Sequence, residues 1–335
     1  MPLPPLPMTQ PRKDLPPAEN PGTALLLTSN TARTPVTFVS TPLAFPHPRS
    51  EDIAVNGSLQ HRPCRQSSPV RNLLGVLLLA LPLNPLVAQE ATSPPPLADV
   101  DEAGRQQIEQ FNSDARRDAE QRLQTNPEPP AGQPGTVDLW STRGDAHMFL
   151  GNFAAAETSY RQMIQLDPTL DPSHWRLGIA CFFADHAKAG ADQFEKYHSF
   201  DSVDRENGIW RYFCHHRAAG RDAAKQQLLR YEKDDRPPFR EVYQMFQGQL
   251  TPAAVLAAAE AGAETSRPQR QFYSWLYVGL NAALEGDRKL AEAALSKAVL
   301  NDWGRRAGYG PNYMWHVGRL ELNRLRQPDK PNKPK

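Results

Sequence analysis

Apolar residues in the last two thirds of the chain recur at helical spacing, and the whole pattern repeats with a period of 34 residues. A shift of 34 relates a first unit, 137–170, to a second unit, 171–204, placing Gly178 and Phe194 at positions equivalent to those of the first. The pattern predicts two antiparallel helices in each unit and therefore an all-α fold. The first unit contains the most complete set of pattern residues: Trp140, Gly144, Leu150, Gly151, Phe153, Ala156, Tyr160 and Pro168.

Later stretches of the chain keep less of this pattern. The unit 205–238 is degenerate, since Tyr212 stands where the other units have glycine, although four residues remain on the predicted helical faces: Ala218, Ala224, Leu228 and Tyr231. Prolines divide 237–270 into short helices, and Thr251 before a proline is typical of a helix N-cap. The pattern returns in a unit at 272–305, which has Gly279, Gly286, Asp287, Ala291, Leu295 and Ala298.

Packing gives the physical reason for these residue types. Glycine and alanine let the two helices of a unit approach closely, while bulky side chains fill the remaining gap. One unit cannot bury its own apolar face, so neighbouring units must stack into a superhelix, here expected over 136–326. The last part of this domain, 311–326, is predicted to be a C-terminal capping helix with outward-facing arginines at Arg319, Arg324 and Arg326.

The N-terminal third has a different composition, with most of the 33 prolines of the chain and few aromatic residues. Residues 1–69 are predicted to be disordered, because they have too few large apolar side chains to offset the entropy of ordering. Arg71 precedes an apolar run that starts at Leu73 and ends in small residues. This order indicates a secretory signal peptide at 70–88, cleaved near Ala88.

Two questions about this segment stay open. The apolar run is shorter than the roughly 20 residues of a spanning helix and is broken by prolines, but an uncleaved membrane anchor is the alternative to a signal peptide. Residues 1–69 are either a gene-call artefact, with the true start near Val70, or an unusual leader. Under the signal-peptide interpretation the protein is exported to the periplasm or cell envelope, or secreted, and meets the membrane through 73–88 alone.

A proline-rich linker is predicted at 89–135, with one amphipathic helix inside it at 101–124. The helix is expected from a narrow apolar stripe at helical spacing: Ile108, Phe111 and Leu123. At the other end of the chain, residues 327–335 are predicted to be a disordered tail.

Charge and motifs exclude several classes of function. The chain has 38 basic and 37 acidic residues, a net charge of +1, and no long block of one sign, so no nucleic-acid partner is expected. Motifs of the HExxH, GxSxG and CxxC types do not occur in the sequence. We therefore predict no catalytic residue, no metal and no cofactor.

The repeat residues quoted above resemble the tetratricopeptide superfamily over about 137–305. More narrowly, the stretch 206–213, Tyr277-Val-Gly279 and Gly286-Asp287 are similar to the bacterial new-lipoprotein-I type of envelope adaptor. That resemblance implies a periplasmic scaffold for cell-wall hydrolases. The chain departs from the family because no cysteine follows the apolar run, so a lipid anchor is not expected.

In tetratricopeptide superhelices the first helix of each unit lines a concave groove, where ligands usually lie. The resemblance therefore implies an apolar, aromatic groove for a protein or peptide partner, lined by Met148, Phe149, Trp175, Ile179, Phe182, Phe183, Phe213 and Arg217. The lysines and asparagines of a carboxylate-binding groove are missing. Whether the groove binds a partner or is covered by the helix at 101–124 stays open.

Two further features have alternative interpretations. The glycine-rich tract 303–316 is either a loop before the capping helix or a carbohydrate- or anion-binding module that uses Arg305, Arg306, Tyr309 and Trp315. Cys181 and Cys214 lie at nearly equivalent places in adjacent first helices, where they are either two buried thiols or a disulfide.

Overall fold

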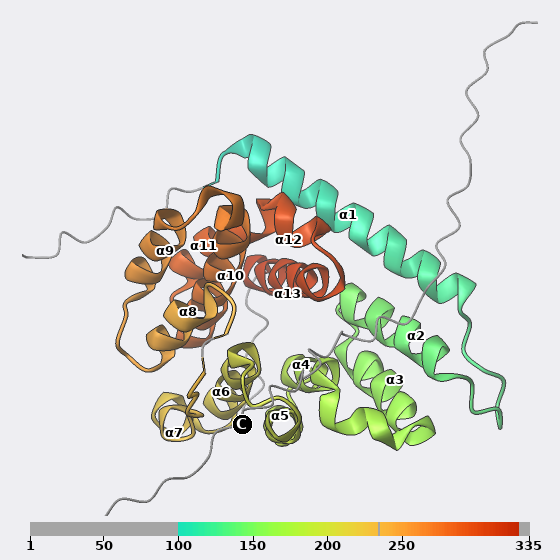
Figure 1. The fold of residues 1–335 in the computed structure, drawn as a ribbon. Coiled ribbons are helices and arrows are strands. Elements are labelled where there is room, and N and C mark those ends of the chain that lie inside the picture. Colours follow the sequence, from blue (N-terminus) through green and yellow to red (C-terminus); the bar gives the residue numbers. More distant parts are fainter. Residues whose placement is uncertain (1–99, 234, 328–335) are drawn as a thin grey trace, which may run out of the picture. The chain divides into compact units, whose positions relative to one another are not determined.

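Successive helices pair along the part of the chain that the computed structural model describes, residues 100–233 and 235–327 (Figure 1). These residues contain no strand, so the predicted all-α fold of the tetratricopeptide type is confirmed for them. The leader, the signal segment and the tail predicted at 327–335, apart from its first residue, lie outside the described residues. None of the helices in the described ranges has the length and apolar character needed to cross a membrane.

The helices follow one another with short connections. A long first helix precedes the repeats, and its bounds are α1 Glu102–Thr125. The repeat helices are α2 Val137–Leu150, α3 Phe153–Leu166, η1 Pro168–Ser173, α4 Trp175–Phe183, α5 Ala187–Phe200, α6 Arg205–Ala219 and α7 Arg221–Gln226. The second half comprises α8 Phe239–Phe246, α9 Pro252–Ala261, η2 Glu264–Ser266, α10 Arg267–Glu285, α11 Arg288–Leu300, α12 Asp302–Arg306 and α13 Tyr309–Arg326.

A close approach of glycine and a large side chain holds each regular helix pair together. A Cβ atom at Gly144 on α2 would lie 2.3 Å from the ring of Tyr160 on α3, which is completely buried. Gly178 meets the ring of Phe194 in the same way, at 2.6 Å. Gly279 approaches Leu295 at 2.7 Å, so the packing predicted for the repeat glycines is confirmed in three units.

The third unit uses a different register from the predicted one. The close approach occurs at Gly208 and not at the predicted position, Tyr212. A Cβ atom at Gly208 would lie 2.4 Å from the hydroxyl oxygen of Tyr231. Tyr231 and Leu228 lie in the loop after α7, so their predicted place on a helix is wrong. The helix α7 ends early at Gln226, and the loop takes over the task of covering the glycine.

The proline-broken middle folds into short helices, as expected. Thr251 accepts a hydrogen bond from the backbone N–H of Ala254 through its side chain, which confirms the predicted N-cap of α9. Its partner α8 buries one apolar face that includes Phe239, Val242 and Phe246.

The last helix, α13, has a buried position rather than the predicted position of an outer cap. It packs against α11, α12, α10 and α2, and α1 lies across α2 and α11 (Figure 1). Arg319 was expected to face solvent, but only 3 % of it is exposed. Its guanidinium donates hydrogen bonds to the carbonyl of Phe149 and the side chain of Asn112, so it joins α13 to α2 and α1.

Candidate functional site

The predicted groove residues come together in space, but α13 lies against them. Phe149 stacks on His316 of α13 with ring centroids 3.7 Å apart, and Trp175 meets Tyr313 edge-on at 4.8 Å. Six of the eight are buried, each at most 7 % exposed: Met148, Phe149, Ile179, Phe182, Phe183 and Phe213. The other two, Trp175 and Arg217, are partly exposed. Their role in binding a partner stays a prediction, and any such partner would compete with α13.

The predicted groove lies on the inner face of the repeats, and the part of this face next to Arg217 of α6 is also closed. The guanidinium of Arg217 stacks over the ring of Phe182 at 3.6 Å and donates a hydrogen bond to its carbonyl. Phe182 and Phe213 face Leu280 and Glu321 across a space of about 10 Å³, which is too small for more than one water molecule. The inner face of α4, α6 and α10 is therefore packed as a core.

The helix α1 was one candidate cover for this face, and it does not take that place. Its stripe residue Phe111 packs instead edge-on against Trp315, with ring centroids 5.9 Å apart. Asn112 of α1 exchanges hydrogen bonds with Asn323 of α13. The covering element is thus α13, and α1 packs on another face of that helix.

A buried polar network fixes the start of α13 to the first repeats. The carboxylate of Asp145, 6 % exposed, accepts hydrogen bonds from the hydroxyls of Tyr160 at 2.7 Å and Tyr309 at 2.6 Å. Arg176 donates to the same carboxylate at 2.7 Å, and Tyr313 lies 3.2 Å from the Tyr160 hydroxyl. One carboxylate with one guanidinium leaves this network close to neutral.

Burial keeps the tyrosines and histidine here uncharged. It raises the pKa of Tyr160 well above the usual value, and the nearby Asp145 carboxylate adds to the effect. Burial also lowers the pKa of His316 well below its usual value, with Arg319 acting in the same direction. His316 is therefore neutral at physiological pH, and its stacking on Phe149 gives it a structural role.

The four residues of the alternative ligand site do not converge. The tract 303–316 is mostly helical, belonging to α12 and the start of α13, so its interpretation as a loop is wrong. Trp315 is buried and donates its indole N–H to the carbonyl of Val299 at 2.8 Å. Tyr309 points to the Asp145 network, while Arg305 stacks on Phe111 at 4.7 Å and the exposed Arg306 pairs with Asp302. The geometry offers no shared site to these side chains.

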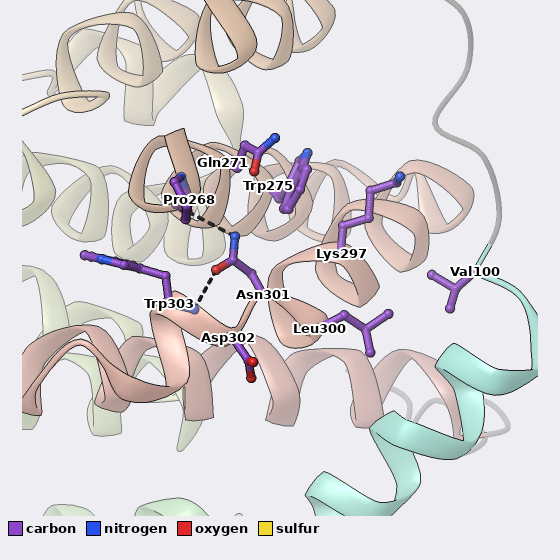
Figure 2. A pocket seen from close by; sticks show the side chains of 9 residues that line it. All are labelled: Val100, Pro268, Gln271, Trp275, Lys297, Leu300, Asn301, Asp302 and Trp303. Atoms are coloured by element: carbon purple, nitrogen blue, oxygen red, sulfur yellow. Dashed lines mark hydrogen bonds between the residues drawn. The ribbon is translucent and has the colours of Figure 1, made fainter. Parts of the chain in front are cut away.

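A surface pocket of about 450 Å³ lies elsewhere, between α10, α11 and α12 at the start of α1 (Figure 2). We call it the Trp275 pocket. Its wall is formed by Val100, Pro268, Gln271, Trp275, Lys297, Leu300, Asn301, Asp302 and Trp303. Sequence reasoning missed it, because its residues come from separate elements and lie on the outer side of the last repeat.

The chemistry of the Trp275 pocket is apolar with a few polar groups. Lys297 places its ammonium 5.9 Å from the Trp275 ring, and its side chain has no ion pair within the described residues. The indole N–H of Trp275 likewise has no hydrogen-bond partner in this part of the chain. Asn301 donates to the carbonyl of Pro268 at 3.0 Å and accepts from the backbone of Trp303 at 2.9 Å, which fixes the pocket floor.

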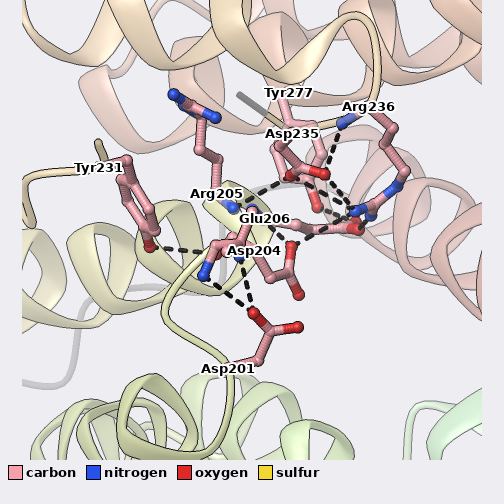
Figure 3. Close-up of polar contacts among 9 residues, drawn as sticks. Asp201, Asp204, Arg205, Glu206, Tyr231, Asp235, Arg236 and Tyr277 are labelled. Atoms are coloured by element: carbon pink, nitrogen blue, oxygen red, sulfur yellow. Dashed lines mark hydrogen bonds and ion pairs between the residues drawn. The ribbon is translucent and has the colours of Figure 1, made fainter. Parts of the chain in front are cut away.

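A second polar cluster lies between the start of α6, the loop after α7 and α10 (Figure 3). Arg236 forms ion pairs with Asp204, Glu206 and Asp235, and Tyr277 donates a hydrogen bond to Glu206. Burial raises the pKa of Glu206 to about 7. No group of three or more His, Cys, Asp or Glu side chains that could hold a metal ion occurs among the described residues.

Both cysteines of the repeats are free thiols in buried positions. Burial raises the pKa of Cys181 to about 12, and it raises the pKa of Cys214 as well. These thiols are therefore protonated and unreactive at physiological pH. The sequence allowed either two buried thiols or a disulfide, and the structure has two buried thiols.

A comparison with protein families adds one match. The tetratricopeptide repeat family model matches residues 137–170, the window with the most complete pattern. The match and the paired helices together support a tetratricopeptide-repeat protein. Proteins of this kind are typically scaffolds for interactions with other proteins, without enzymatic activity.

Proposed function

We propose that this chain is a non-enzymatic scaffold of the cell envelope that binds a polypeptide partner. The observation that carries the proposal is the inner face of the repeats, which holds a polypeptide helix, α13, through ring stacking and hydrogen bonds to the main chain. The repeats of this chain are thus built to bind a helix, and the chain provides that helix itself.

The partner must then use another surface or displace α13. Tyr313, Val317 and Leu322 of α13 are completely buried, and exposing each would cost about 1.5–3 kcal/mol. The sum over the helix is comparable to the whole stability of a typical domain, about 5–15 kcal/mol. We therefore propose that the partner binds at the Trp275 pocket, where partly exposed apolar surface and unpaired donors lie together.

The envelope location rests on the sequence. The basic, apolar and small-residue order at 70–88 supports export, and the resemblance to envelope adaptors supports the same compartment. N-terminal sequencing of the native protein from isolated envelope would test this part. A mature N-terminus near Gln89 is the expected result, and recovery of the protein in the cytoplasm with residues 70–88 intact would contradict it.

An affinity pull-down from the native envelope fraction tests the binding surface. Trp275→Ala should abolish recovery of the partner, because it removes one of the two indole rings that line the pocket. Phe200→Ala is the matched control, since Phe200 is an aromatic residue, 58 % exposed, on α5. Recovery of the partner with Trp275→Ala, or equal loss with both variants, would overturn the proposed surface.

A further inference from the structure

The chain enters the described structure at the rim of the Trp275 pocket. Val100 is both the first described residue and part of the pocket wall. Its carbonyl accepts a hydrogen bond from Arg105 at 2.8 Å. A Cβ atom at Gly104 would lie 2.3 Å from Val100 and 3.2 Å from Leu300, so the missing side chain allows this close approach. Val100 is therefore held in place at the pocket wall.

The sequence immediately before this point is rich in proline. It reads Ser93-Pro-Pro-Pro96-Leu97-Ala-Asp99, followed by Val100. Consecutive prolines favour the extended polyproline II conformation, which leaves its carbonyls without internal hydrogen bonds. Proteins recognise such segments with grooves in which aromatic rings pack on the prolines and donors reach the carbonyls.

The Trp275 pocket has these two features. Trp275, Pro268 and Leu300 supply apolar surface for proline rings. The indole N–H of Trp275 and the ammonium of Lys297 are donors without partners in the described residues. The pocket wall has two charged side chains, Lys297 and Asp302. Arg305 and Arg306 form ion pairs with Asp302 and so neutralise its charge. The ammonium of Lys297 can donate hydrogen bonds to main-chain carbonyls, so a carbonyl-rich ligand with apolar rings suits this wall.

We propose that the Trp275 pocket is occupied by the chain's own proline tract, Pro94–Pro96. At about 3.1 Å per residue, the four residues between Pro96 and Val100 span at most roughly 12 Å when extended. The tract is therefore tethered close to the pocket wall, of which Val100 is a part. A tether this short gives an effective concentration in the millimolar range, so weak contacts are enough for occupancy. The tract shares its pocket with the proposed function and would have to leave before a partner binds there.

Fluorine NMR on the full chain tests this occupancy without any partner. The protein is labelled with 5-fluorotryptophan, and the Trp275 resonance is assigned from its absence in Trp275→Phe. The variant Pro94→Ser/Pro95→Ser/Pro96→Ser keeps the chain length. We expect its Trp275 resonance to shift and to show an increased solvent-isotope effect. A synthetic peptide of residues 91–99 should reverse both changes in this variant and leave the wild-type spectrum unaltered.

A matched control and two opposing outcomes complete the test. Pro127→Ser/Pro129→Ser/Pro130→Ser removes three prolines from the second linker and should leave the Trp275 resonance in place. An unchanged Trp275 resonance in the first variant would overturn the proposal, as would a wild-type resonance that shifts on adding peptide. A Trp275 resonance that depends on protein concentration would assign the pocket to a second copy of the chain instead. Because no partner is present, failure here leaves the pull-down result untouched.

Discussion

In both the first repeat and the degenerate third unit a tyrosine ring covers a helical glycine, but the ring comes from different kinds of segment. In the first, Tyr160 of a full second helix covers Gly144. In the third, Tyr231 covers Gly208 from a loop, because α7 ends after six residues, at Gln226. The close approach of a ring to a helical glycine is therefore common to these two units, while the register and the secondary structure that supply the ring differ.

The two regions differ more sharply in their charges. Asp145 of the first repeat is one carboxylate that accepts from Arg176 and two hydroxyls. At the third unit, three carboxylates share the guanidinium of Arg236. A buried pair with matched charge stabilises its surroundings as long as both partners stay, whereas an excess of buried carboxylates disfavours the ionised state.

The largest expected effect comes from breaking the matched network. Asp145→Asn should lower the free energy of unfolding by about 3–5 kcal/mol, because it leaves the buried guanidinium of Arg176 without its counter-charge. Urea denaturation followed by circular dichroism measures this change. Glu206→Gln is the paired variant, and it should cost little, since Asp204 and Asp235 still pair with Arg236. Equal losses in the two variants would show that the networks do not differ as described.

The second effect comes from the glycines. Gly144→Ala should destabilise the fold by about 2–3 kcal/mol, because the new methyl group meets the buried Tyr160 ring and overpacks the helix crossing. Gly208→Ala meets only the hydroxyl end of the partly exposed Tyr231, which can shift. The helical preference of alanine, about 1 kcal/mol over glycine, should offset that strain. A loss at Gly208 as large as that at Gly144 in the same denaturation assay would refute the distinction.

The contrast also explains what the sequence could predict. The repeat period and the residues at the helix crossings, such as Gly144 with Tyr160, are local and periodic, so the all-α fold followed from them. The register of the third unit was missed because the shift by one helical turn, from Tyr212 to Gly208, leaves the helix itself unchanged and is decided by the ring that packs on it.

The site was harder to predict than the fold. The eight groove residues were found together, but their cover was not, because α1 and α13 both have apolar stripes and only tertiary packing selects between them. The sequence signal for α13 was present in Tyr313 and Val317, whereas the buried Arg319 pointed to a solvent-facing cap. The Trp275 pocket joins residues of α10, α11 and α12 and Val100, which precedes α1, and no spacing in the sequence relates them.

The third effect is a dependence on pH that belongs to the third unit. Glu206 has a pKa of about 7 in the folded protein, raised from 4.5 by burial. Between these two values the folded state binds more protons than the unfolded state, so this group makes the protein less stable as the pH rises. The full shift corresponds to about 3 kcal/mol, and we expect roughly 1–2 kcal/mol after relaxation.

Denaturation curves of the wild type and Glu206→Gln between pH 4.5 and 7.5 isolate this contribution. The difference between the two free energies of unfolding should change steadily with pH, with the glutamine variant gaining relative stability toward pH 7. The free energy of unfolding of Asp145→Asn, measured over the same pH range, provides the comparison from the first repeat. A difference between wild type and Glu206→Gln that stays constant across this range would contradict the raised pKa.

The smallest effect is expected where neither burial nor packing acts. Arg306 and Asp302 form an exposed ion pair at 3.6 Å, with 68 % and 59 % of their side chains accessible. Solvent screening limits such pairs to about 0–1 kcal/mol, so Arg306→Ala should change the free energy of unfolding by less than about 0.5 kcal/mol and even less in high salt. The Arg176–Asp145 pair is closer, at 2.7 Å, and its side chains are only 14 % and 9 % exposed, so the exclusion of water makes it far more stabilising. If Arg306→Ala and Asp145→Asn gave comparable losses, burial would not be the cause of the difference between the two regions.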